Sequence, residues 1–187
     1  MIGDYKGTVA NKVVTALLQA YLDILDYDGM KSILREANML DIKNQREIDP
    51  NQTIDFFSFK KIIAAQNCLL YECTDLLFEI GRKFSFYLYP FGKSFQESIE
   101  DITELIDTQW DVKIVKSSKK EVRVEVENCV FCSEIGVTCD LFVGFLVHTL
   151  EKTLTSQQKV EYKGKVKNPQ DPKHNYFTAI LKIRKNK

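Results

Sequence analysis

The sequence predicts an α+β fold in which N-terminal helices pack on a small antiparallel sheet. Apolar residues recur at helical spacing between residues 9 and 106, and they alternate with charged residues at several places after residue 111. One strongly apolar helix is expected between two pairs of strands, which gives the order strand–strand–helix–strand–strand. We therefore expect the 187 residues to form one domain, with a helical part over 1–108 and a mixed part over 109–187.

The first two helices are predicted from apolar spacing. Over residues 9–25 the apolar positions fall on one wide face, formed by Val13, Val14, Leu17, Leu18, Tyr21, Leu22 and Leu25. The turn at 26–29 ends this helix, and a short helix is expected over 30–37. The polar segment 38–51 is expected to form a loop.

A long helical region follows that loop. It is expected to begin near Thr53 or Asp55, because either side chain can cap a helix, and to end before Pro90. Its length predicts a break near 66–67. A further amphipathic helix is expected over 94–106.

The strands of the second half are predicted from period-two patterns. Val122, Val124 and Val126 alternate strictly with charged residues, and a shorter alternation over 112–114 precedes them. After a helix over 140–154, two more strands are expected around the apolar positions Val160, Tyr162, Val166, Phe177, Ala179, Leu181 and Ile183. Short connections between these elements favour antiparallel pairing.

Composition excludes several classes of protein. Lysine plus arginine and aspartate plus glutamate each number 26, so no net charge attracts nucleic acid or an anionic membrane. The apolar stretch 141–147 is too short to span a bilayer. Five cysteines, an odd number, without a secretory signal favour reduced thiols and a cytoplasmic protein.

Three cysteines form the most informative motif of the chain. Cys129 and Cys132 make a Cys-x-x-Cys turn after a strand, and Cys139 opens the next helix. A helix N-terminus favours a thiolate, and this spacing suits metal ligation, although it supplies three ligands rather than four. Reactive thiols and simple packing as small apolar side chains are the alternatives.

The same region carries a resemblance to a known family. A valine-rich strand, then Asn128 to Cys132, then the run from Cys139 to Leu146 resembles the 4-vinyl-reductase domain family of hydrocarbon-binding proteins. That family is similar in fold to the small TRAPP subunits and to haem-based nitric-oxide sensors. The resemblance is strongest over 112–183, and it implies a TRAPP-subunit-like fold, a homodimer formed through helices and an apolar ligand pocket.

The resemblance also implies a cofactor. Some aromatic-sensing relatives carry a structural zinc, with one ligand at the position of Cys139. Where those relatives have further cysteines, this chain has none, and His174 is the soft ligand of that loop. The implied zinc site is therefore Cys129, Cys132, Cys139 and His174, unless the chain is a member that has lost its metal.

Aromatic residues suggest where a ligand would bind. They crowd the helical stretch 56–91, and aromatic rings line many small-molecule pockets. We expect an uncharged cavity between the central helices and the sheet, lined by Phe78, Phe84, Tyr87, Phe142 and Phe145. The alternative is that these rings fill the core and a dimer interface.

Three functions are compatible with these patterns. The first is a non-catalytic binding or sensory module for an apolar small molecule, because no nucleophile motif, phosphate-binding loop or carboxylate pair is present. The second is a tetrapyrrole reductase or its accessory protein, which rests on the family name alone. The third is a scaffold subunit of a larger assembly, in the manner of the TRAPP subunits.

Overall fold

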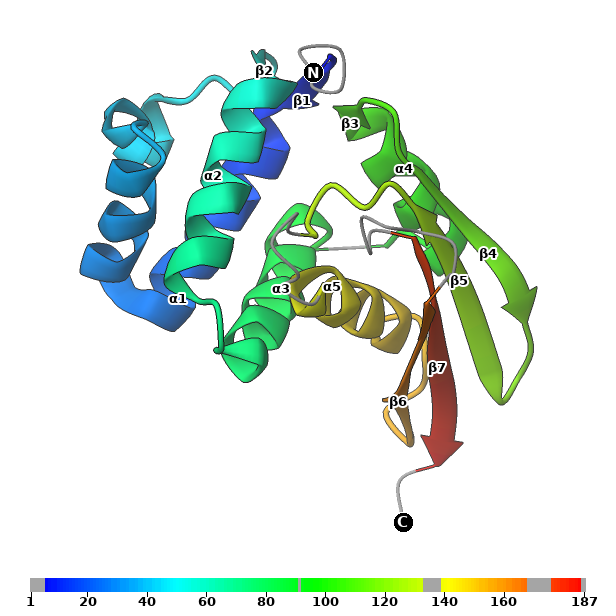
Figure 1. Ribbon diagram of the computed structural model, residues 1–187. Helices are drawn as coiled ribbons and strands as arrows, with labels where there is room; N and C mark the ends of the chain where they lie inside the picture. The colour runs from blue at the N-terminus through cyan, green and yellow to red at the C-terminus, as the bar shows by residue number, and fades with distance from the viewer. Residues whose placement is uncertain (1–5, 91, 133–138, 168–175, 186–187) are drawn as a thin grey trace.

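The computed structural model describes residues 6–90, 92–132, 139–167 and 176–185 (Figure 1). Its helices are α1 (Asn11–Glu36), α2 (Phe56–Leu69), α3 (Thr74–Leu88), α4 (Phe95–Leu105) and α5 (Asp140–Glu151), with short 3-10 turns at Leu40–Lys43 and Gln45–Glu47. Its strands are β1 (Thr8–Ala10), β2 (Thr53–Asp55), β3 (Ile106–Asp107), β4 (Asp111–Ser117), β5 (Glu121–Glu127), β6 (Gln158–Lys167) and β7 (Phe177–Lys185).

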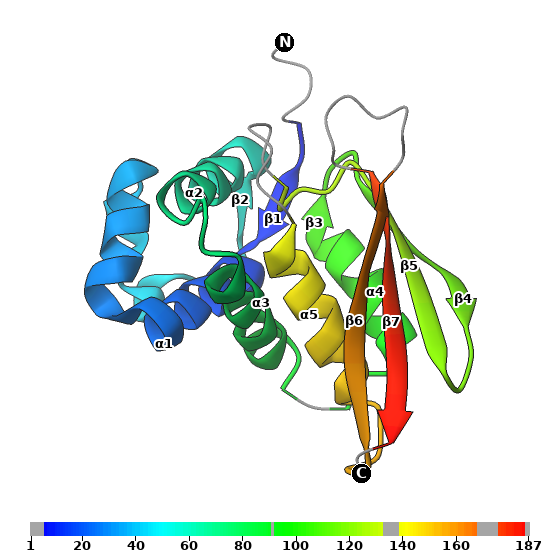
Figure 2. The same ribbon diagram turned by 60° about the horizontal axis from the view of Figure 1, so that its bottom comes forward.

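The elements form three layers. Helices α1 and α2 lie on one side, α3 and α5 lie in the middle, and the sheet of β4 to β7 lies on the other side (Figures 1 and 2). The sheet has the antiparallel order β4-β5-β7-β6, and α4 packs against β4. The predicted α+β class and the order strand–strand–helix–strand–strand are confirmed.

The valine alternation sets the inner face of this sheet. Val122, Val124 and Val126 of β5 are buried, and the charged residues between them are half-buried on the outer face. Phe177, Ala179 and Leu181 of β7 are buried by the same period. A second sheet, of order β2-β1-β3, was not predicted, because strands of two or three residues carry no readable period.

Helix α1 leaves helical geometry at the predicted turn. Asp26 has φ of +62°, and its Oδ1 accepts hydrogen bonds from the N–H groups of Asp28 (2.9 Å) and Gly29 (3.0 Å). These bonds satisfy two donors at the start of the second segment, as an N-cap residue does. The turn at 26–29 is therefore a kink within α1.

The break in the second helical region falls later than predicted. Gln66 and Asn67 lie inside α2, which ends at Leu69, and both side chains are buried. Tyr21 donates to Gln66 Oε1 (2.7 Å), Gln66 donates to Asn67 Oδ1 (3.0 Å), and Asn67 donates to the carbonyl of Phe131 (3.3 Å). This polar pair therefore joins α1, α2 and the turn after β5.

Helices α3 and α5 cross with their backbones in contact. A Cβ on Gly81 would lie 1.8 Å from the carbonyl oxygen of Leu141, and a Cβ on Gly144 would lie 2.0 Å from that of Phe78. Beside this crossing, Ser85 Oγ lies 2.7 Å from Thr149 Oγ1, and both residues are buried. Glycine is therefore required at both positions for the two helices to approach this closely.

Within the described ranges, no helix has the length and apolar character needed to cross a membrane.

We predict that Gly144→Ala lowers the free energy of unfolding by about 1–3 kcal/mol, because the added methyl group would overlap backbone of α3. In a helix without such a contact, the same change stabilises by up to about 1 kcal/mol, so the sign of the effect identifies the cause. Urea unfolding followed by circular dichroism measures it, and an increase in stability would contradict the crossing.

We predict that Tyr21→Phe destabilises the protein by about 1–3 kcal/mol, because it removes the donor to the buried amide oxygen of Gln66. The matched control is Tyr71→Phe, at a ring that is 53% exposed, and it should change stability by less than about 0.5 kcal/mol. Equal urea midpoints for the two variants would show that the buried bond contributes nothing.

Candidate functional site

Three of the five predicted pocket residues meet in the interior. The ring of Phe145 on α5 lies 5.2 Å from that of Phe84 on α3 and 5.5 Å from that of Phe142, measured between ring centroids. The planes of Phe142 and Phe145 are 13° apart, which is an offset-stacked arrangement. The sequence therefore identified the centre of an aromatic cluster.

The other two predicted residues lie outside this cluster. Tyr87 is half-buried and donates a hydrogen bond to Asp23 Oδ2 of α1 (2.6 Å), which raises its pKa. Phe78 is half-buried, and its carbonyl lies against Gly144 at the helix crossing. Neither side chain makes a described ring contact with the three buried phenylalanines.

Two rings that were not predicted also belong to the cluster, and Phe59 and Tyr89 lie at its edge, 6.0 Å from Phe131 and 6.1 Å from Phe145. Phe131, in the Cys-x-x-Cys turn, stacks on Phe142 at 5.3 Å, and Trp110 lies 5.6 Å from Phe142. The Trp110 indole N–H donates to the carbonyl of Ile106 (2.8 Å), so the ring is fixed just before β4. A lone aromatic residue in a turn carries no periodic signal, which is why the sequence did not place either ring.

The expected cavity between the central helices and the sheet is filled by these rings. Phe84, Phe142 and Phe145 each have 0% exposed surface, whereas a ring beside a void large enough for water would keep some accessible area. Ligand contact by these residues stays a prediction, and it requires the rings to separate.

The three cysteines of the motif do meet. The sulfur atoms of Cys129, Cys132 and Cys139 all lie within 4.8 Å of one another, all three thiols are buried, and Cys129 Sγ lies 2.8 Å from Cys139 Sγ. Burial raises the pKa of Cys132 and Cys139. Burial acts in the same direction on Cys129, but hydrogen bonds from the other two thiols outweigh it and lower the pKa of Cys129.

Helix α2 holds the cysteine turn from outside. The Lys60 ammonium group donates to the carbonyls of Val130 and Cys132, at 3.0 Å each, and Asn67 binds the carbonyl between them. Lysine here satisfies backbone oxygens that the turn leaves without partners. The fourth residue of the predicted metal site, His174, lies outside the described residues.

An open groove of about 690 Å³ lies at the other end of α5. Its apolar wall is formed by Phe95, Ile114, Val122, Leu150, Leu154 and Ile183. Lys119 is its one charged residue among those described, and Ser94, Ser117, Ser118 and Thr153 add hydroxyl groups. The sequence did not predict this groove, because α4, β4, β5, α5 and β7 each contribute one or two residues to it.

Two of the comparisons with known proteins give no match. No protein-family model matches this chain, and no curated protein matches it either. Membership of the 4-vinyl-reductase family therefore stays a prediction.

Solved structures of H-NOX domains do match. A double variant of Tt H-NOX is 15% identical with a TM-score of 0.62, and an oxygen-binding H-NOX domain related to soluble guanylate cyclases, in its oxygen complex, is 15% identical with a TM-score of 0.58. Both alignments cover 96% of each chain. An Fe(II) unliganded mutant H-NOX protein from K. algicida is 12% identical with a TM-score of 0.59, over 95% of this chain and 98% of that one.

The prediction of structural zinc as the cofactor is wrong. Two of the solved neighbours are described by haem, one through its redox potential and porphyrin distortion and one through haem distortion, and a third is described as Fe(II) unliganded. Cys129, Cys132 and Cys139 form a thiol cluster, but the group named for these neighbours is haem rather than zinc. What this chain shares with these proteins is the fold of the H-NOX domain, as the resemblance to haem-based nitric-oxide sensors implied.

Proposed function

We propose that the chain is a non-catalytic sensory module that binds an apolar small molecule in the groove between α4, α5 and the β4–β5 hairpin. The observation that carries this proposal is the groove itself, with a volume of about 690 Å³ and an apolar wall of six side chains. Small-molecule sites have volumes of about 300–1,000 Å³ and mostly apolar linings with a few polar groups. The groove replaces the central cavity that the sequence suggested.

The chemistry of the groove favours binding over catalysis. Its polar groups are hydroxyls, amides and the Lys119 ammonium group, and the described residues lining it include no histidine, cysteine or carboxylate that could act as a general base. A serine without a base is a weak nucleophile. The groove can hold a ligand by apolar contact and orient it through hydroxyl groups.

The position of the groove favours a sensory role. A molecule in it touches Leu150 at the end of α5, while Cys139 stands at the other end of the same helix. It also touches α4 and β4, so ligand contact is made with several elements at once. The oxygen-binding H-NOX domain with this fold is a precedent for small-molecule binding, although its ligand differs in kind.

The described residues of this chain do not fit haem, the group by which the solved neighbours are described. Haem iron needs an axial side chain such as histidine, cysteine, methionine or tyrosine. The thiols of Cys129, Cys132 and Cys139 are buried against one another, with all three sulfur atoms within 4.8 Å. His148 is the one histidine among the described residues. Its Nδ1 lies 3.1 Å from Ser85 Oγ, and the hollow beside it has a volume of about 220 Å³ with Glu79, Arg82 and Lys83 in its wall. Among the described residues, the rings of Phe84, Phe142 and Phe145 have no exposed surface, so no open space lies against them.

The hydroxyl groups of two buried tyrosines, which could also serve as axial ligands, already donate hydrogen bonds to other side chains. Tyr21 donates to Gln66, and Tyr89 donates to Asp101 Oδ2 (2.8 Å). Both pKa values are raised by burial, and the bond to the Asp101 carboxylate raises that of Tyr89 further, so neither phenol supplies an anionic ligand at neutral pH. We therefore place the function in a module that works without haem.

Homodimer formation through the helices stays a prediction. Large apolar side chains are exposed on α2 and α3, namely Phe57, Leu69, Leu76 and Phe86. A second copy covering them would bury the side of α3 that the fold leaves open.

We predict that the purified protein does not form a stoichiometric haem complex. Titration with haemin should give the spectrum of free haemin plus weak surface binding, without a sharp Soret band that saturates at one haem per chain. A saturating one-to-one Soret shift that is lost in His148→Ala would contradict this prediction and would assign the iron to His148.

We predict that N-phenyl-1-naphthylamine, a neutral apolar fluorophore, binds one-to-one in the groove. Ile114→Thr removes about two apolar carbons from the wall and should weaken binding about tenfold, at about 0.8 kcal/mol per CH₂. The matched control is Val115→Thr, the next residue of β4, which is 51% exposed and does not line the groove. No saturable fluorescence increase, or equal loss in both variants, would refute the site.

A further inference from the structure

We propose that the molecule bound in the groove is a single-chain amphiphile with an anionic head, of the class of long-chain carboxylates and alkyl phosphates. This inference rests on the proposed function and names its ligand class. The apolar chain lies in the groove, and the anionic head lies on a basic hollow that adjoins it.

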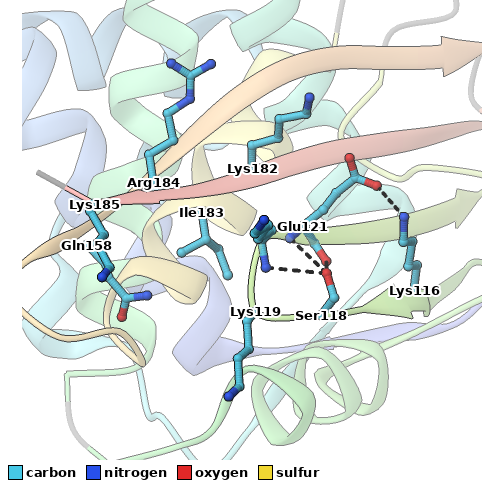
Figure 3. A pocket seen from close by; sticks show the side chains of 10 residues that line it. Lys116, Ser118, Lys119, Glu121, Gln158, Lys182, Ile183, Arg184 and Lys185 are labelled. Atoms are coloured by element: carbon cyan, nitrogen blue, oxygen red, sulfur yellow. Dashed lines mark hydrogen bonds and ion pairs between the residues drawn. The ribbon is translucent and has the colours of Figure 1, made fainter.

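The basic hollow lies at the end of the sheet, where the β4–β5 turn meets the end of β7 (Figure 3). Its volume is about 860 Å³, and it is lined by six cations, Lys116, Lys119, Lys120, Lys182, Arg184 and Lys185, and by one carboxylate, Glu121. The whole chain has a formal net charge of zero, so this end of the sheet concentrates positive charge that is balanced elsewhere.

Three of these cations are uncompensated. Glu121 already binds Lys116 and Arg123, each at 2.9 Å, and Arg184 binds Glu161 at 2.5 Å. Lys182 lies across the strands from the same Glu161, so a carboxylate is already near it. The remaining cations of the hollow make no ion pair with any residue that the structure describes: Lys119, Lys120 and Lys185. An anionic group placed among these three would interact favourably with each of them.

The hollow and the groove adjoin each other. They share Ser118, Lys119, Gln158 and Ile183. Figure 3 shows Lys182 and Arg184 on one side of β7 and Ile183 on the other side, toward Lys119. Ser118 is held in place because its hydroxyl accepts from the N–H of Glu121 (3.1 Å) and donates to the carbonyl of that residue (3.0 Å).

The position of the apolar groove next to the basic hollow indicates the class of ligand. A neutral apolar molecule would fill the groove and leave Lys119, Lys120 and Lys185 without a counter-charge. A small polar anion would bind the lysines and leave the apolar wall in water. An amphiphile satisfies both surfaces at once, and lysine, a flexible point charge, accepts a carboxylate or a phosphate head equally well.

The test is displacement of N-phenyl-1-naphthylamine by three ten-carbon competitors: decanoate, decyl phosphate and 1-decanol. At pH 8 and low salt we expect at least one of the two anions to compete about tenfold better than the alcohol, which corresponds to about 1.4 kcal/mol. Added salt should reduce this advantage, because exposed charges are screened, and should leave 1-decanol unaffected. The better anion identifies the head group.

The double variant Lys119→Gln/Lys185→Gln should lose most of the advantage of the anions while binding the neutral fluorophore as before. The matched control is Lys167→Gln, an exposed lysine at the opposite end of the same sheet, and it should keep the advantage. Because these lysines are exposed, the substitutions leave the core intact, and circular dichroism checks this.

The outcomes separate this inference from the proposed function. Equal competition by all three compounds, with the fluorophore bound, overturns the anionic head and leaves the apolar site standing. Binding of the protein to phosphatidylglycerol vesicles without displacement of the fluorophore overturns it in favour of a membrane surface. Absence of fluorophore binding overturns both proposals.

Discussion

The contact between α3 and α5 is the constraint on which the rest of the structure depends. Gly81 and Gly144 let the two backbones approach until a single methyl group would collide with a carbonyl oxygen. At that distance, Phe84 of one helix reaches Phe145 of the other, and Ser85 reaches Thr149. The apolar face of α5 is thereby fixed toward the sheet. The rings of α3 and α5 meet at this crossing and form the centre of the aromatic cluster.

Because aromatic rings fill the space beside α5, the cysteine cluster and the apolar groove lie at the two ends of this helix. At its N-terminus, Cys139 joins the thiols of the turn after β5. At its C-terminus, Leu150 forms part of the apolar groove, next to a basic hollow. The chain shares the fold of H-NOX domains. A shared architecture does not by itself carry a shared ligand, so the ligand has to be argued from the side chains of this chain.

The sequence predicted the features that depend on local periodicity. The valines of β5 fixed its inner face, and Asp55 was a correct cap for α2, since its side chain accepts from the N–H of Ser58 (2.8 Å). The groove could not be predicted, because its wall is assembled from elements far apart in the chain. The break predicted near 66–67 from the length of the helical region falls after Leu69, and the sequence could not show that Gln66 has a buried partner, Tyr21, inside the helix.

The hydrogen-bonded series from Tyr21 through Gln66 and Asn67 to the carbonyl of Phe131 has a consequence for how the two halves of the chain recognise each other. Two packed apolar surfaces can shift relative to each other, because one apolar contact replaces another at little cost in free energy. Directional bonds do not allow this, since a shift of one helical turn would strand buried amides without partners. The side chains of Tyr21, Gln66 and Asn67 thus specify one alignment of α1, α2 and the turn after β5. An arrangement in which the helices are shifted by a turn has a higher free energy and is less populated during folding.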